Sequence, residues 1–166
     1  VVPRPLLETA LNHRANGLSL TPELFSALMQ QASGLARGAG MEMEFVELGA
    51  AALPLAERQL LMEVFPRARI YLQYGLTEAP RSVITELRSD LKKPDTIGRP
   101  LPETRIAVVD GGGAQLPTGK PGEIMISGDH LFTRYWSGDP SYQATRNGHR
   151  WFRTDDMGVL DKEGYL

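Results

Sequence analysis

The stretch Ala68-Arg-Ile-Tyr-Leu-Gln-Tyr-Gly-Leu-Thr-Glu-Ala79 decides the fold class of this chain. Its first six residues alternate apolar and polar side chains, which is the pattern of a half-buried strand. A helical pattern over residues 55–65 comes before it and stops at Pro66, because the residue before a proline is disfavoured in a helix. A helix followed by a strand predicts an α/β fold, with a functional loop where the strand ends.

The sequence before this stretch repeats the alternation of helix and strand. Thr21 and Pro22 predict a helix start, because a threonine hydroxyl caps free amides and proline is tolerated in the first turn. A strand over residues 44–48 follows. The apolar residues of the first helix recur at helical spacing: Leu24, Phe25, Leu28 and Met29. We expect residues 1–92 to form an α/β portion.

The sequence after it is richer in glycine, with eleven of the 17 glycines in residues 91–166. Short strands are predicted over residues 105–109 and 123–127, separated by the turn segments 110–113 and 117–122. Short strands joined by Gly/Pro turns are typical of small antiparallel β-structures. We therefore expect residues 93–166 to form a small antiparallel β-barrel subdomain.

The composition excludes several classes of protein. The 166 residues are 42% hydrophobic and 23% charged, with a net charge of −2, so the charge gives no attraction for nucleic acid or anionic lipid. No apolar run approaches the ~20 residues of a transmembrane helix. The absence of cysteine excludes disulfides and thiolate-bound metals. His13, His130 and His149 lack metal-ligand spacing. We expect a cytoplasmic protein without nucleic-acid partners.

Three segments at the ends of predicted elements carry the candidate chemistry. Residues 49–54, Gly-Ala-Ala-Ala-Leu-Pro, would let a flat ligand approach the backbone, or would form only a tight strand-to-helix turn. In residues 74–79, Tyr74 offers a stacking face and Thr77 a hydroxyl, while Glu78 offers an oxygen ligand for magnesium. The alternative for this second segment is a capped turn with a surface carboxylate.

The third segment is residues 151–158, Trp-Phe-Arg-Thr-Asp-Asp-Met-Gly. A carboxylate there is suited to accept hydrogen bonds from both hydroxyls of a ribose. The alternative is an Asx-turn between two strands, where adjacent aspartates are common. Residues alone leave the two interpretations open.

The order and spacing of these segments resemble the adenylate-forming superfamily of acyl- and aryl-CoA synthetases, luciferases and peptide-synthetase adenylation domains. Residues 74–78 match its Tyr-Gly-x-Thr-Glu motif, and residues 49–54 match its Gly-Gly-Ala-Pro-Leu-Pro turn with two changes. The other matching segments are Gly98-Arg99-Pro100, Gly122-Glu123-Ile124, Phe132 to Trp136 and Trp151 to Asp156. The similarity covers most of the chain, which reads as an internal fragment of such an enzyme.

The resemblance implies a ligase that joins a carboxylic acid to ATP and passes the acyl group to coenzyme A. By carry-over, Tyr74 would pack on adenine, Thr77 would bind the α-phosphate, Glu78 would ligate Mg²⁺ and Asp156 would hold the ribose; Thr77 and Glu78 would be the catalytic pair. The remaining residues that the resemblance places at the ATP/AMP site are Gly49, Ala50, Ala51, Gln73 and Gly75. The residues that it places at the acyl pocket are Gly49, Ala79, Pro80 and Arg81.

Several positions depart from the family pattern. Asp155 replaces a glycine, and aspartate tolerates positive φ better than most residues do. Arg134, Gln73, Ala50 and Ala52 are also changes, which bear on the choice of acid more than on the reaction. Arg81 would meet a substrate carboxylate or else form a surface ion pair. Trp136 and Trp151 are expected to pack in the barrel.

The family's lysine-bearing phosphate loop and its C-terminal lid have no match in these residues. We therefore expect this piece alone to be inactive and, because a cut fold exposes apolar surface, to self-associate. The acyl acceptor stays open between CoA and a carrier-protein thiol. Fatty-acyl-AMP ligases, peptide-synthetase adenylation domains and a non-catalytic nucleotide-binding module are the alternatives to a CoA ligase.

Overall fold

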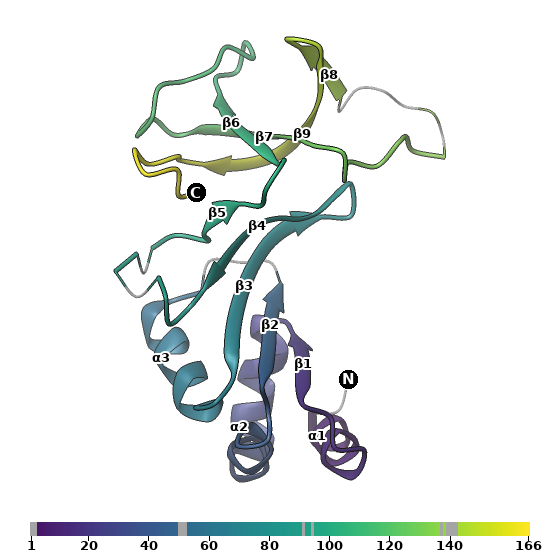
Figure 1. The fold of residues 1–166 in the computed structure, drawn as a ribbon, viewed down its shortest axis with the longest axis vertical. Helices are drawn as coiled ribbons and strands as arrows, with labels where there is room; N and C mark the ends of the chain where they lie inside the picture. The colour runs from purple at the N-terminus through teal and green to yellow at the C-terminus, as the bar shows by residue number, and fades with distance from the viewer. Residues whose placement is uncertain (1–2, 50–52, 91, 94, 137, 139–142) are drawn as a thin grey trace. The chain divides into compact units, whose positions relative to one another are not determined.

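The computed structural model describes residues 3–49, 53–90, 92–93, 95–136, 138 and 143–166 (Figure 1). The chain forms two compact units. The first unit consists of Val1–Gln73 with Thr85–Thr96, and the second unit consists of Tyr74–Ile84 with Ile97–Leu166. The α/β class expected from the sequence is confirmed.

The first unit contains helices and parallel strands in alternation. Its elements are α1 (Pro3–Asn12), β1 (Gly17–Leu20), α2 (Pro22–Gly40), β2 (Phe45–Gly49), α3 (Leu55–Val64) and the first part of β3 (Arg69–Leu76). Strand β2 pairs in parallel with both β1 and β3, and α1 packs on α2. Strand β2 ends at Gly49, which is the register partner of Gln73, while β3 continues to Leu76.

The helix starts and strand faces follow the sequence pattern. The Thr21 hydroxyl accepts a hydrogen bond from the Leu24 amide at 3.2 Å, and Pro22 occupies the first turn of α2. On β3, Ile70 and Leu72 are buried while Arg69 is exposed, which confirms the predicted alternation. The largest fully buried side chains of this core include Phe25, Leu28, Leu61, Val64, Phe65 and Ile70.

Strands β3 and β4 (Ala79–Glu86) pass from one unit into the other. They are neighbours in a five-stranded sheet of order β1-β2-β3-β4-β5, with β5 spanning Arg99–Pro100. The chain changes unit within β3 after Gln73, within β4 after Ile84, and again after Thr96. A single boundary at residues 92–93 stays a prediction about subdomains.

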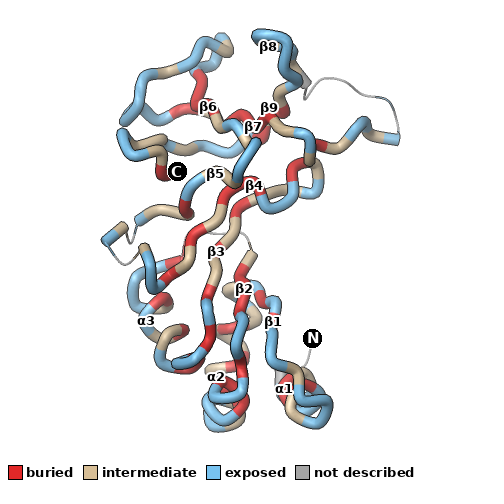
Figure 2. The backbone as a smooth tube through the Cα atoms, viewed as in Figure 1, coloured by how far each residue is buried: buried red, intermediate tan, exposed pale blue. Residues whose placement is uncertain are grey.

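The second unit contains a four-stranded antiparallel sheet of order β6-β7-β9-β8. The strands are β6 (Arg105–Val109), β7 (Gly122–Ser127), β8 (Gln143–Arg146) and β9 (His149–Gly158). Strand β7, one of the two inner strands, is buried at every position except Glu123 (Figure 2). Within the described residues the outer strands β6 and β8 do not pair with each other, so closure into a barrel is not confirmed.

The two tryptophans differ in environment. Trp151 is half-buried and packs against Ala107, Val109 and Met125. Trp136 is fully exposed, so the expectation that it packs in the barrel is wrong. Among the described helices, none has the length and apolar character to cross a membrane.

Candidate functional site

The hairpin β3–β4 carries the Tyr-Gly-x-Thr-Glu segment at its tip. Thr77 and Glu78 form the whole connection, and a two-residue connection joins antiparallel neighbours. A Cβ on Gly75 would lie 2.4 Å from the amide nitrogen of Arg81 and 2.7 Å from the carbonyl oxygen of Ala79. Glycine is therefore required there, and Arg81 itself adopts a positive φ of 49°.

The Glu78 side chain is held by the connection between β7 and β8. Its Oε1 accepts a hydrogen bond of 2.7 Å from the Tyr135 hydroxyl, and its backbone carbonyl accepts one of 2.8 Å from the Phe132 amide. Glu78 is half-buried, and the neighbouring Thr77 is exposed. The carboxylate consequently has one defined orientation at the hairpin tip, and the Thr77 side chain faces solvent.

Tyr74 and Asp156 are joined directly. The Tyr74 hydroxyl donates a hydrogen bond of 2.7 Å to Oδ2 of Asp156. The tyrosine is only 8% exposed, within an apolar cluster that includes Val83 and Phe152. Burial raises the pKa of the Tyr74 phenol, and the hydrogen bond to Asp156 acts in the same direction. Tyr74 is therefore a neutral donor, and stacking of an adenine on its ring stays a prediction.

The backbone around Asp156 is irregular. Its amide donates to Oγ1 of Thr154 at 3.1 Å, and the Thr154 hydroxyl donates to the Ile124 carbonyl at 2.8 Å. The pairing of β7 with β9 shifts register between Glu123 and Met125. Asp155 lies at this bulge with a φ of +59°. The position is thus one that favours glycine, and aspartate occupies it.

The other predicted nucleotide contacts lie in the first unit. Gly49 is the register partner of Gln73, and a Cβ on Gly49 would be 3.2 Å from Nε2, the side-chain amide nitrogen of Gln73. That nitrogen donates a hydrogen bond of 2.9 Å to Oε1 of Glu47, which is 7% exposed. Ala50, Ala51 and Ala52 lie outside the described residues. The Gln73 side chain therefore crosses the end of β2.

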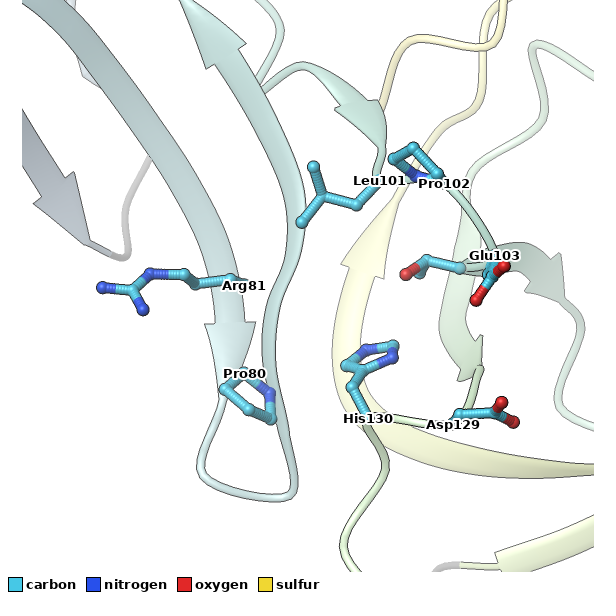
Figure 3. Close-up of a pocket in the computed structure, with 8 residues that line it drawn as sticks. Pro80, Arg81, Leu101, Pro102, Glu103, Asp129 and His130 are labelled. Atoms are coloured by element: carbon cyan, nitrogen blue, oxygen red, sulfur yellow. The ribbon is translucent and has the colours of Figure 1, made fainter.

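A small cavity of about 200 Å³ lies beside Pro80 and Arg81 in the second unit (Figure 3). Its other lining residues are Leu101, Pro102, Glu103, Thr104, Asp129 and His130. The Arg81 side chain points away from His130. Ser82 is buried, and its Oγ lies 2.9 Å from Nε2 of the His130 ring. Of the three residues expected at the acyl pocket after Glu78, Ala79 is buried and the other two line this cavity.

The structure brings together residues that the sequence left separate. Tyr135 lies in the Phe132–Trp136 segment, which the sequence matched to a family motif, but its contact with Glu78 carries no local signal. The roles of Thr154 and Glu47 were not predicted either, because the sequence does not show which group the hydroxyl or carboxylate of a strand residue will contact.

The Glu78 carboxylate fits a magnesium ion that is shared with a phosphate. Among the described residues, Oε2 has no hydrogen-bond partner, while Oε1 is oriented by Tyr135. No group of three or more His, Cys, Asp or Glu side chains capable of holding a metal occurs in the described part of the chain. Magnesium bound through one or two carboxylates plus substrate phosphates needs no such cluster.

Comparison with known proteins gives consistent matches. The family model for AMP-binding enzymes matches residues 2–136. The chain is 36% identical over 95 residues to a long-chain-fatty-acid–CoA ligase of Escherichia coli O6:H1, covering 56% of this chain and 16% of the relative. It is 28% identical over 151 residues to 4-coumarate–CoA ligase-like 4 of Oryza sativa subsp. japonica, covering 90% and 27%.

Solved structures agree in fold. The crystal structure of VinN has 33% identity and a TM-score of 0.80, covering 97% of this chain and 41% of VinN. The crystal structure of CmiS6 has 25% identity and a TM-score of 0.85, covering 99% of this chain and 42% of CmiS6. The chain thus spans less than half the length of each of these relatives and neighbours. The resemblance inferred from the sequence motifs is confirmed.

Proposed function

Since the chain belongs to the family of AMP-binding enzymes, we propose that it is part of an AMP-forming acyl- or aryl-CoA ligase. In the first step a carboxylate oxygen bonds to the α-phosphorus of ATP, and pyrophosphate leaves. In the second step the CoA sulfur bonds to the acyl carbon, AMP leaves with the bonding pair, and the thiol loses its proton. The names of the curated relatives, which are CoA ligases, support this acceptor.

The observation that carries the proposal is the placement of two carboxylates in the second unit. Glu78 is fixed by Tyr135 at the hairpin tip, and Asp156 is fixed by Tyr74 at the bulge of β9. We assign Glu78 to magnesium and Asp156 to the ribose hydroxyls, with Thr77 donating to the α-phosphate. Two carboxylates in distinct hydrogen-bonded settings fit two different parts of one nucleotide.

The chemistry requires opposing negative charges to meet. A carboxylate that attacks a phosphate approaches an anion, and a bound magnesium ion would neutralise part of that charge. The protein's own part is to hold Glu78 in one orientation and to present the exposed Thr77 hydroxyl. A solved neighbour of 21% identity is a complex with ATP and magnesium ion, which is consistent with these ligands.

The backbone positions Gly49, Ala50, Ala51, Gln73 and Gly75 are proposed for the rest of the nucleotide site. Small residues there would let the base edge approach the main chain. Ala79, Pro80 and Arg81 are proposed for the acyl pocket, with Gly49. One solved neighbour, VinN at 31% identity, is a complex with L-aspartate, so amino acids belong among the acids to test with fatty and aryl acids.

The test is exchange of labelled pyrophosphate into ATP, run on the whole protein that contains these residues with a fatty acid, 4-coumarate and L-aspartate. Acid-dependent exchange is expected, with a loss of about 100-fold in Glu78→Gln, since magnesium-mediated charge stabilisation is worth several kcal/mol. Glu63→Gln, an exposed glutamate of α3, is the matched control. Exchange that is equal in both variants would remove Glu78 from the site.

Product analysis separates the alternatives. Acyl-CoA as the product supports the CoA ligase, whereas acyl-AMP that accumulates and transfers only to a carrier-protein thiol favours a fatty-acyl-AMP ligase or a peptide-synthetase domain. Binding of an acyl-adenylate analogue without any turnover favours a non-catalytic nucleotide-binding module. The proposal also includes a cytoplasmic location for the protein and a role in fatty acid metabolism.

We propose further that residues 1–166 alone do not form the adenylate and that they self-associate. Purified chain is expected to release no pyrophosphate with any acid and to sediment faster than a monomer. Pyrophosphate release would contradict the first statement. A concentration-independent monomer in sedimentation would contradict the second.

A further inference from the structure

The connection between β7 and β8 makes two separate hydrogen bonds to Glu78. The Phe132 amide binds its carbonyl at 2.8 Å, and the Tyr135 hydroxyl binds its Oε1 at 2.7 Å. A glutamate at a hairpin tip ordinarily samples several rotamers, and each is lost at an entropic cost when a ligand binds. These two contacts restrict both the backbone and the carboxylate before any ligand arrives.

The connection is itself anchored, so the Tyr135 hydroxyl has a defined position. Arg150 on β9 donates to the carbonyl of Leu131 at 3.1 Å and to that of Thr133 at 3.2 Å. The Phe132 ring meets the Tyr135 ring edge-on at 4.7 Å between centroids, and it meets Phe152 at 5.5 Å. These contacts restrict the Tyr135 ring and therefore the position of its hydroxyl.

We propose that Tyr135 is a positioning residue that orients the Glu78 carboxylate for the magnesium ion of a bound nucleotide. The inference rests on the proposed function, which assigns magnesium to Glu78. A phenol donates one hydrogen bond to Oε1 and leaves the lone pairs of Oε2 for a cation. An arginine or lysine in this place would cancel the negative charge of the carboxylate, whereas a tyrosine hydroxyl orients the carboxylate and leaves its charge for the cation.

The experiment measures Mn²⁺ binding by the protein in the presence of ATP, as the fall in the electron paramagnetic resonance signal of free Mn²⁺ below that of the same Mn²⁺ and ATP without protein. The whole protein that contains these residues is compared with its variants Tyr135→Phe, Tyr135→Ala, Glu78→Gln and Tyr71→Phe. Tyr71→Phe is the matched control, because its hydroxyl has no hydrogen-bond partner among the described residues and its ring packs on Phe45 in the first unit. Pyrophosphate exchange as a function of magnesium concentration is measured alongside.

Tyr135→Phe is expected to weaken Mn²⁺ binding about tenfold, which is typical of the loss of a group that orients a metal ligand. Glu78→Gln should weaken it more, and Tyr71→Phe should stay within about twofold of the wild type. Tyr135→Ala should add little to Tyr135→Phe if the hydroxyl rather than the ring is responsible. In the exchange assay the magnesium requirement should rise while the rate at saturating magnesium changes less.

The outcomes separate the two proposals. If Glu78→Gln weakens Mn²⁺ binding and Tyr135→Phe behaves like Tyr71→Phe, the positioning role is wrong and the function of Glu78 stands. If Glu78→Gln has no effect, or the wild type binds no Mn²⁺ with ATP, both are wrong. If circular dichroism shows that Tyr135→Phe is unfolded, Arg150→Gln takes its place. Arg150→Gln releases the connection between β7 and β8 while leaving Glu78 and Tyr135 intact. An unchanged affinity for Mn²⁺ in that variant would overturn the inference.

Discussion

The first and second units place their side chains by different physical means. The first unit has the larger apolar core, formed by helices and parallel strands, and at the strand ends Gln73 donates a side-chain hydrogen bond to Glu47. In the second unit the apolar clusters are smaller, and the candidate site residues are tied by hydrogen bonds such as Tyr74 to Asp156. Arg58 and Arg88 also donate hydrogen bonds to backbone carbonyls in the first unit. In the second unit it is the candidate site side chains themselves that polar contacts orient.

This difference teaches where each kind of substitution should matter. Apolar burial is non-directional and scales with area, so it sets stability more than geometry. Hydrogen bonds contribute less net free energy but fix direction. Truncations in the first unit should therefore lower stability strongly, whereas hydroxyl deletions in the second unit should alter geometry at a small cost in stability.

Leu61→Ala is expected to give the largest effect, because the side chain is fully buried on α3. We expect a loss of about 3 kcal/mol in the free energy of unfolding, from lost transfer energy and the cavity left behind. Urea unfolding measures it. Leu55→Ala on the same helix, where the side chain is 50% exposed, should change stability by less than about 0.5 kcal/mol. Equal losses would break the comparison.

Gly75→Ala comes next, since it forces a Cβ against the backbone of the facing strand. We expect a loss of about 2 kcal/mol, because the hairpin must open to relieve the overlap. Gly34→Ala is the control: the glycine is helical with open space around it, so alanine should stabilise the chain by up to about 1 kcal/mol. Thermal unfolding that shows the same sign for both would contradict the structure.

Tyr74→Phe should cost about 1 kcal/mol at pH 8, because it removes the hydrogen bond to the exposed Asp156. The effect should shrink as the pH rises. Burial raises the pKa of Tyr74 above its ordinary value of 10.0, so the unfolded chain loses that proton first and binds fewer protons above pH 10. Stability is thus lost with rising pH in the wild type.

The measurement is urea unfolding of both proteins at pH 8 and pH 10.5. The difference in free energy of unfolding between the wild type and Tyr74→Phe should be smaller at pH 10.5 than at pH 8. The other tyrosines do not contribute to this change, because both proteins contain them. An advantage that grows with pH would show that Tyr74 is not a buried neutral phenol.

Asp155→Gly should have the smallest effect, a gain of about 1 kcal/mol or less, because glycine adopts a φ of +59° without the strain that a side chain adds. Asp110→Gly is the matched control with the opposite sign. Oδ1 of Asp110 accepts hydrogen bonds of 2.9 Å from the amides of Gly112 and Ala114, so its loss should destabilise that turn. Differential scanning calorimetry resolves the two signs.

Some features of the fold were predictable because they depend on neighbours a few residues away. The helix start at Thr21 and the alternation on β3 each follow from side chains within one or two turns or strand repeats. For Thr77 and Glu78 the sequence predicts only a loop, because it does not show that the next strand pairs back on β3 to make a two-residue hairpin tip. Turn residues likewise do not determine which outer strands pair, so closure of the second sheet into a barrel did not follow from them.

The sequence by itself determined the α/β class, the positions of Tyr74, Glu78 and Asp156 in their motifs, and the family. Only the tertiary structure decided which side chains hold them: Tyr135 lies 57 positions from Glu78, and Asp156 lies 82 positions from Tyr74. The physical reason is that propensity and periodicity act locally, whereas these hydrogen bonds depend on the register of β9, the bulge at Asp155 and the packing of the β7–β8 connection.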